Sequence, residues 1–170
     1  MDEIRALTVR QPRAWAIIYG GKDVENRSRN IAGKYRGPVA IHAAKSHDRY
    51  LFGYSDDYLL RRALLAEERA MSADHRVTCA HWGDLPFPGL VCGAIIGVVD
   101  LVDVHEPSKT RKDGKTGRCS DWAFPGMWHL VLENPRPLPE PVPWKGQLGL
   151  WRLNVDKYNN WHTAGIEALL

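Results

Sequence analysis

Apolar and polar residues alternate in short runs along the chain, and this spacing predicts strands. Residues 7–10 alternate as a half-buried strand does. Residues 38–44 follow the same pattern, with Val39 and Ile41 on one side of the expected strand and His42 on the other. Further strands are predicted over residues 92–104, as a central pair or one long bent strand rich in Val and Ile, and over residues 128–133 and 149–155.

Helical spacing is confined to three segments. Trp15 and Ile18 lie three residues apart on one face of a predicted helix over residues 12–19, which Gly20 and Gly21 end. Pro12 suits its first turn because proline has no backbone N–H to lose there. The other predicted helices cover residues 56–71, with an apolar face opposite Arg and Glu, and residues 161–170.

The remaining segments are connections. Residues 106–121 are charged and polar, which predicts a long loop. Proline occupies every second position from Pro135 to Pro143, which predicts an extended connector with few backbone donors. Because strands and helices do not alternate regularly, we expect an α+β fold built on a small β-barrel with flanking helices. A single domain is expected over residues 1–170, with a core over about 7–153 and a C-terminal extension over 154–170.

Composition bears on the cellular compartment in which the protein is expected. The chain has 170 residues, and its most apolar run, residues 93–99, is far too short to span a membrane. The N-terminus does not resemble a secretory signal. Three cysteines at no disulfide-like spacing are expected to be free thiols, which favours the cytoplasm.

Positive charge is concentrated near the N-terminus. The net charge is only +3, but residues 1–50 carry ten Lys or Arg against five Asp or Glu. A second basic region lies within residues 105–121. Basic segments beside aromatic residues are typical of proteins that bind polyanions, although an ordinary solvated surface fits the same pattern.

The most informative local motif is G-x-K-x-x-E-x-R over residues 20–27. Glu25 and Arg27 are two apart and therefore share one side of a strand. They fit either a structural ion pair at one end of the barrel or a role in a cleft. Lys22 follows the glycine turn and would serve as a base if it is buried, or as a phosphate contact if it is exposed.

Four ordered segments carry a family resemblance. These are residues 7–12 together with the motif, residues 35–43, residues 93–100 and residues 128–135. In this order they resemble the ASCH family, most closely the ASCH domain of a transcriptional coactivator. The resemblance implies a PUA-like β-barrel with a cleft beside the motif strand. It also implies binding of RNA or DNA, or, as in a few bacterial members, hydrolysis of N4-acetylcytidine; a ribonuclease activity is attributed to one member.

Three positions depart from the family pattern. Arg13 and Arg29 stand where aromatic residues are usual, which replaces two stacking rings by cations and favours phosphate contacts. Glu25 stands where the amidohydrolase members have a nucleophilic Thr. Any hydrolysis here is therefore expected to use Glu25 as a base for water rather than a threonine ester.

These arguments give a set of candidate site residues. Lys22 and Glu25 are the catalytic candidates. The nucleic-acid-binding candidates are Arg10, Gln11, Arg13, Lys22, Arg27, Arg29, His42, Ser120 and Trp122. A lone histidine on a strand is more often a core residue than a ligand contact, and Trp122 also fits plain core packing.

The expected partners are a nucleic-acid strand or a nucleoside, with no membrane. We expect no cofactor and no metal, because Cys119 with His129 does not match a zinc spacing and the sequence contains no phosphate-binding loop.

Overall fold

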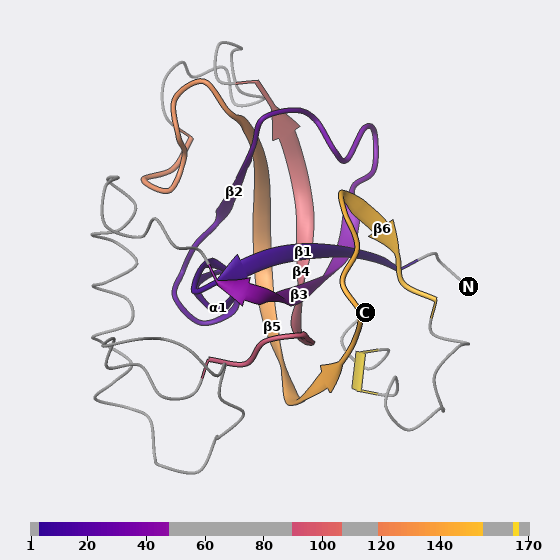
Figure 1. The fold of residues 1–170 in the computed structure, drawn as a ribbon. Helices are drawn as coiled ribbons and strands as arrows, with labels where there is room; N and C mark the ends of the chain where they lie inside the picture. The colour runs from indigo at the N-terminus through magenta and orange to yellow at the C-terminus, as the bar shows by residue number, and fades with distance from the viewer. Residues whose placement is uncertain (1–3, 48–89, 107–118, 155–164, 167–170) are drawn as a thin grey trace.

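The computed structural model of the chain describes residues 4–47, 90–106, 119–154 and 165–166 (Figure 1). Its elements, in chain order, are β1 (Arg5–Gln11), α1 (Arg13–Ile18), β2 (Val24–Arg27), β3 (Gly37–His47), β4 (Ala94–His105), β5 (Trp128–Pro143) and β6 (Leu150–Arg152). The helix predicted over residues 56–71 lies outside the described residues, as do most of the loop at 106–121 and most of the terminal helix.

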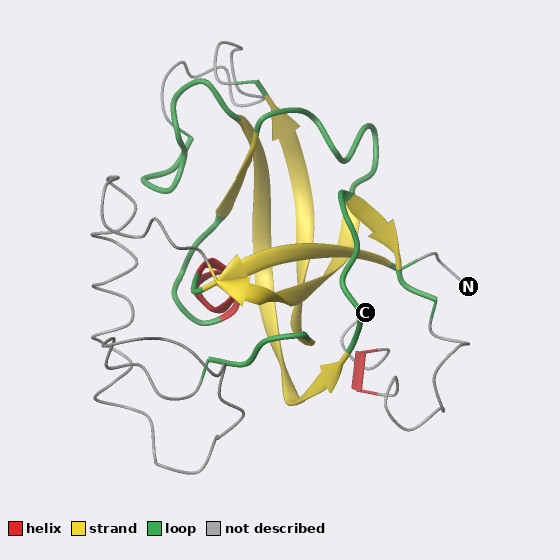
Figure 2. Cartoon of the chain, in the orientation of Figure 1, coloured by secondary structure: helices red, strands yellow, loops and turns green. Residues whose placement is uncertain are grey.

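The strands form one sheet in the order β2-β5-β4-β3-β1-β6. The β1–β3 pair is parallel, and the other four pairs are antiparallel. The long strands β4 and β5 cross the direction of β1 and β3, so that the sheet curls, and α1 lies at one end of the curl (Figure 2). Among the described residues, the expected α+β fold, a small barrel-like sheet with a flanking helix, is confirmed.

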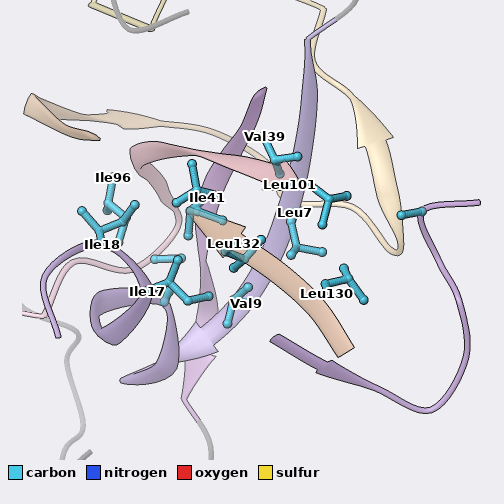
Figure 3. Close-up of a cluster of buried hydrophobic side chains, with 14 residues drawn as sticks. Leu7, Val9, Ile17, Ile18, Val39, Ile41, Ile96, Leu101, Leu130 and Leu132 are labelled. Carbon is cyan, nitrogen blue, oxygen red and sulfur yellow. The ribbon is translucent and has the colours of Figure 1, made fainter. Parts of the chain in front are cut away.

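The main core fills the inside of the curled sheet. Leu7 and Val9 of β1 and Ile41 of β3 pack there against Ile17 and Ile18 of α1 (Figure 3). A Cβ at Gly97 of β4 would lie 2.7 Å from both the Ile18 side chain and the carbonyl oxygen of Arg136. Glycine is therefore required at position 97 for α1 and β5 to approach β4 so closely.

A second core covers the other face of the sheet. Successive residues of a strand point to opposite faces, so Ala6 and Ala40 belong to this second cluster while their neighbours fill the first. Trp144, Trp151 and Ile166 pack here. Both faces are thus buried, which explains why β4 reads as a nearly continuous apolar run.

The proline-rich segment corrects one expectation. It is not a connector but the second half of β5, and Pro137 pairs with Gly97 while Pro143 pairs with Ala94. β2 pairs only with the first residues of β5, so the proline-rich second half of β5 borders β4 alone. Prolines at alternate positions direct their missing N–H groups to one side of a strand, and an edge strand tolerates this.

The structure also bears on the expectations about the cysteines and about a membrane span. Cys119 is a free thiol, as expected, whereas Cys92 takes part in a disulfide, so the expectation of three free thiols is wrong. An odd number of cysteines still allows one pair, and sequence spacing did not reveal it. Across the described residues, no helix is both long and apolar enough to span a bilayer.

Candidate functional site

The motif strand is positioned by the turn that ends α1. Gly21 adopts a φ of 70°, which lets the chain reverse after the helix. The backbone N–H groups of both Gly20 and Lys22 bond to the carbonyl oxygen of Ala16. β2 then runs along the edge of the sheet, where Glu25 pairs with Leu130 of β5.

Glu25 and Arg27 point to the same side of β2, as expected. Nη2 of Arg27 lies 3.1 Å from Oε1 of Glu25 and donates a hydrogen bond of 3.0 Å to the carbonyl oxygen of Thr8 in β1. Three strands separate β1 from β2 in the sheet, so this arginine ties the two together across the curl. The hydrogen bond from Arg27 to Thr8, rather than the ion pair within β2, therefore spans the opening of the curled sheet.

A cleft of about 950 Å³ lies beside this ion pair. Its charged lining comes from Arg10 and Arg13, at the end of β1 and the start of α1, and from Glu25 and Arg27. The rest of its wall consists of Thr8, Val9, Asn26, Ala44, Ser46, Phe124, Pro125, Met127, Gln147, Leu148 and Gly149. Glu25 and Arg27, which form the ion pair, are thus also among the residues that line the cleft.

The side chain of Lys22 is fully buried in the protein and is not exposed to the cleft. Its Nζ donates a hydrogen bond of 2.5 Å to the carbonyl oxygen of Val24, and it lies 4.0 Å from Oε2 of Glu25. It also lies 5.2 Å from the centre of the Trp122 ring, at cation–π distance. Lys22 is not among the residues that line the cleft, whereas Glu25, 4.0 Å from its Nζ, is one of them.

The other predicted residues are placed as follows. Gln11 is buried, and its side chain bridges the carbonyl oxygen of Val91 and the backbone N–H of Trp15. Trp122 is a buried core residue. Ser120 donates to the Asp23 carboxylate and accepts from the Trp122 N–H, which caps a turn.

Arg29 is exposed in the loop after β2, outside the cleft lining. Of the predicted residues, the structure therefore brings Arg10, Arg13, Glu25 and Arg27 together around one cleft.

His42 lines a second hollow of about 760 Å³, which shares Thr8, Gln147 and the exposed Leu148 with the cleft. Its Nε2 donates to the carbonyl oxygen of Trp144 at 2.9 Å. Burial lowers the pKa of His42 below its ordinary value, and the bond to Trp144 opposes this only in part. His42 is therefore neutral at neutral pH, with its charge suppressed by desolvation.

Sequence reasoning missed the residues that line the cleft but lie far from the motif in the sequence. Phe124 and Met127 come from a segment almost a hundred residues after the motif. Asn26 fixes that segment, because its Nδ2 donates to the carbonyl oxygen of Trp122 and its Oδ1 accepts from the N–H of Phe124, both at 2.8 Å. The only available signal was the presence of an amide side chain between Glu25 and Arg27.

Comparisons with known proteins give structural similarity only. No protein-family model matches the chain, and no curated protein matches it. Solved structures of the ASCH protein of Zymomonas mobilis are similar to this chain at 13% identity. A tyrosine-to-phenylalanine variant aligns over 99% of both chains with a TM-score of 0.48. A further structure of the Zymomonas mobilis ASCH protein aligns over 98% of this chain and 95% of its own, with a TM-score of 0.43.

Proposed function

We propose that the chain binds a nucleic-acid strand, RNA or DNA, in the cleft beside β2. One observation carries this proposal: Arg10, Arg13 and Arg27 line a single cleft together with Phe124. Arginines contact phosphates, and an aromatic ring offers a surface on which a base stacks. Phe124 supplies this ring from another part of the chain. The family pattern has its aromatic residues at positions 13 and 29 instead.

The size of the cleft supports a strand over a single small molecule. At about 950 Å³ it is near the upper end of small-ligand pockets, and it shares lining residues with the hollow beside His42. Glu25 faces the same space, but Arg27 neutralises it at 3.1 Å. The cationic groups therefore dominate the field that an approaching phosphate meets.

The experiment is a salt titration of binding to a short single-stranded RNA and to the DNA of the same sequence. Each lost phosphate contact should lower the slope of log affinity against log salt by about 0.7. We expect this for Arg10→Ala and for Arg13→Ala. Lys34→Ala is the matched control, since Lys34 is exposed outside the cleft and should leave the slope unchanged. No binding at low salt, or an equal effect of Lys34→Ala, would overturn the proposal.

A second candidate function is hydrolysis of a modified nucleoside of the N4-acetylcytidine type, or of RNA. The burial of Lys22 favours it, because Lys22 and Arg27, at 4.0 and 3.1 Å from the Glu25 carboxylate, fix the orientation of this group beside the cleft. Glu25 would take a proton from water, whose oxygen attacks the acyl carbon. The C–N bond breaks, the leaving nitrogen takes a proton, and acetate and cytidine are released.

This second function has its own test. Parent and Glu25→Gln protein are incubated with N4-acetylcytidine and with short RNA, and acetate and RNA fragments are measured. Glu25→Gln keeps the shape of the side chain and removes the base, so a hydrolase would lose at least about 100-fold in rate. Lys22→Met removes the buried ammonium group at similar side-chain length, and turnover that survives this substitution would remove Lys22 from catalysis. Absence of turnover in the parent leaves the binding function as the one supported.

A further inference from the structure

Three side chains that bind transition metals converge where β4 ends and β5 begins. They are His105, Cys119 and His129, and their ligand atoms all lie within 4.8 Å of one another. His105 and His129 are partners in the β4–β5 register, and their rings meet edge to face with centroids 5.3 Å apart. Sγ of Cys119 lies 3.3 Å from Nδ1 of His129.

The hydrogen bonds around the two histidines fix which ring nitrogen is available. Nε2 of His129 lies 2.7 Å from the carbonyl oxygen of Phe124, which only accepts, so Nε2 carries the hydrogen. The lone pair of neutral His129 is therefore on Nδ1, the atom that faces Cys119. Nδ1 of His105 lies 2.9 Å from Oδ2 of Asp103, which leaves the lone pair of neutral His105 on Nε2.

This arrangement is the one found around protein metal ligands. A histidine that binds a metal generally donates its other N–H to a carboxylate or to a backbone carbonyl. Here His105 has the carboxylate of Asp103 and His129 has the carbonyl of Phe124. His129 is buried, while His105 and Cys119 are half-buried, so the cluster is shielded yet reachable.

We propose that His105, Cys119 and His129 bind a zinc ion. One thiolate sulfur and two imidazole nitrogens are a ligand set typical of Zn²⁺. Binding displaces the thiol proton of Cys119, so one proton is released as the Zn–S bond forms. A Cys–His pair acting as a nucleophile is the competing reading of the 3.3 Å contact. It would not require the third group, His105, nor the carboxylate that orients it.

The consequence of such a site is a cross-link between distant segments. The ion would join the end of β4, the segment that begins at Cys119 and the start of β5. The same segment carries Phe124, whose ring lines the cleft and whose carbonyl holds His129. The metal would thus fix one wall of the cleft, and this inference stands whether or not the cleft binds nucleic acid.

The test is metal binding to the full chain. Zn²⁺ affinity is measured by competition with a chromophoric chelator, and Co²⁺ is used as a spectroscopic probe. We expect one ion per chain and a sulfur-to-cobalt charge-transfer band that disappears in Cys119→Ser. The affinity for Zn²⁺ should fall more than about 100-fold in Cys119→Ser and in His129→Gln, and about 10-fold in Asp103→Asn.

Asp100→Asn is the matched control, because Asp100 is also a half-buried aspartate of β4 but pairs with Arg136. It should leave the Zn²⁺ affinity unchanged. The melting temperature is measured with and without Zn²⁺ to separate misfolding from loss of a ligand, and the ion should raise it in the parent but not in Cys119→Ser. A Co²⁺ complex without the thiolate band, or a Zn²⁺ affinity indifferent to Cys119→Ser, would overturn the proposal. So would alkylation of Cys119 that Zn²⁺ does not slow.

Discussion

The side chain of Asn26 holds the backbone of Phe124 in place: its Oδ1 accepts a hydrogen bond of 2.8 Å from the Phe124 N–H. Its Nδ2 donates to Trp122, two residues earlier. One amide on the motif strand thus positions the segment that forms the far wall of the cleft. The motif and this wall are separated by almost a hundred residues, and Asn26 joins them directly.

Asn26→Ala should therefore destabilise the fold. It removes two partly buried hydrogen bonds and leaves a backbone N–H and a carbonyl to find new partners, at a cost of about 2–4 kcal/mol in the free energy of unfolding. Urea unfolding measures the change. Asn154→Ala is the control, since Asn154 is exposed and should change stability by less than about 0.5 kcal/mol. Equal effects of the two substitutions would refute the role of Asn26.

Phe124→Ala should weaken strand binding with little effect on the Phe124 backbone contacts. A stacked base contributes about 1–3 kcal/mol, so the affinity should fall by roughly 5- to 150-fold. Fluorescence anisotropy with the oligonucleotides of the salt titration measures it. Phe124→Tyr keeps an aromatic ring and should retain most of the affinity. An affinity that survives Phe124→Ala would remove stacking from the binding mechanism.

His42 should make the fold less stable in mild acid. Burial lowers its pKa in the folded state, so below the ordinary value of about 6.5 the unfolded chain takes up a proton that the folded chain refuses. Above about pH 6.5 the titration of His42 does not change the free energy of unfolding. As the pH falls below this value, the free energy of unfolding decreases by up to about 1.4 kcal/mol per pH unit, until the pKa of His42 in the folded state is reached.

The check is urea unfolding of parent and His42→Gln between pH 7.5 and 5.5. Other titrating groups are common to both proteins, so the difference between the two curves isolates His42. The parent should lose stability more steeply than the variant over this range. Parallel curves would show that His42 does not titrate differently in the two states.

Gly97→Ala should be destabilising although it adds only one methyl group. The new Cβ would meet the Arg136 carbonyl and the Ile18 side chain at 2.7 Å, and overpacking of this kind costs about 1–3 kcal/mol. Gly165→Ala is the control, because its Cβ would make an ordinary 3.6 Å contact with Leu138. Thermal unfolding of both variants provides the measurement. A tolerated Gly97→Ala would mean that α1 moves freely away from β4.

Local patterns predicted the described elements well, because each has a periodic signal. β1, β3 and α1 appeared where alternation and helical spacing put them, and the strand predicted over residues 92–104 proved to be one long strand, β4, over Ala94–His105, with three register shifts against β5. The extent of β5 was missed since a proline-rich strand looks like a connector unless its edge position is known. The sequence carries no information about which side of a strand lacks a neighbour.

The site was predicted only where its residues are close in sequence. Glu25 and Arg27 share a side of β2 by simple alternation, and Arg10 and Arg13 follow from the same N-terminal segment. The burial of Lys22 depended on Trp122, and the approach of His105 to His129 depended on the β4–β5 register. Both are products of tertiary pairing, which linear spacing does not encode.

The pairing of β1 with β6 bears on how the chain folds during synthesis. β1 lies between β3 and β6, and Leu7 pairs with Leu150. A ribosome releases β1 early and β6 late, so one edge of β1 remains open while the intervening residues are made. An open strand edge is a template for unwanted pairing with other chains. Nascent chains arrested before residue 150 should therefore depend on chaperones more than completed ones do.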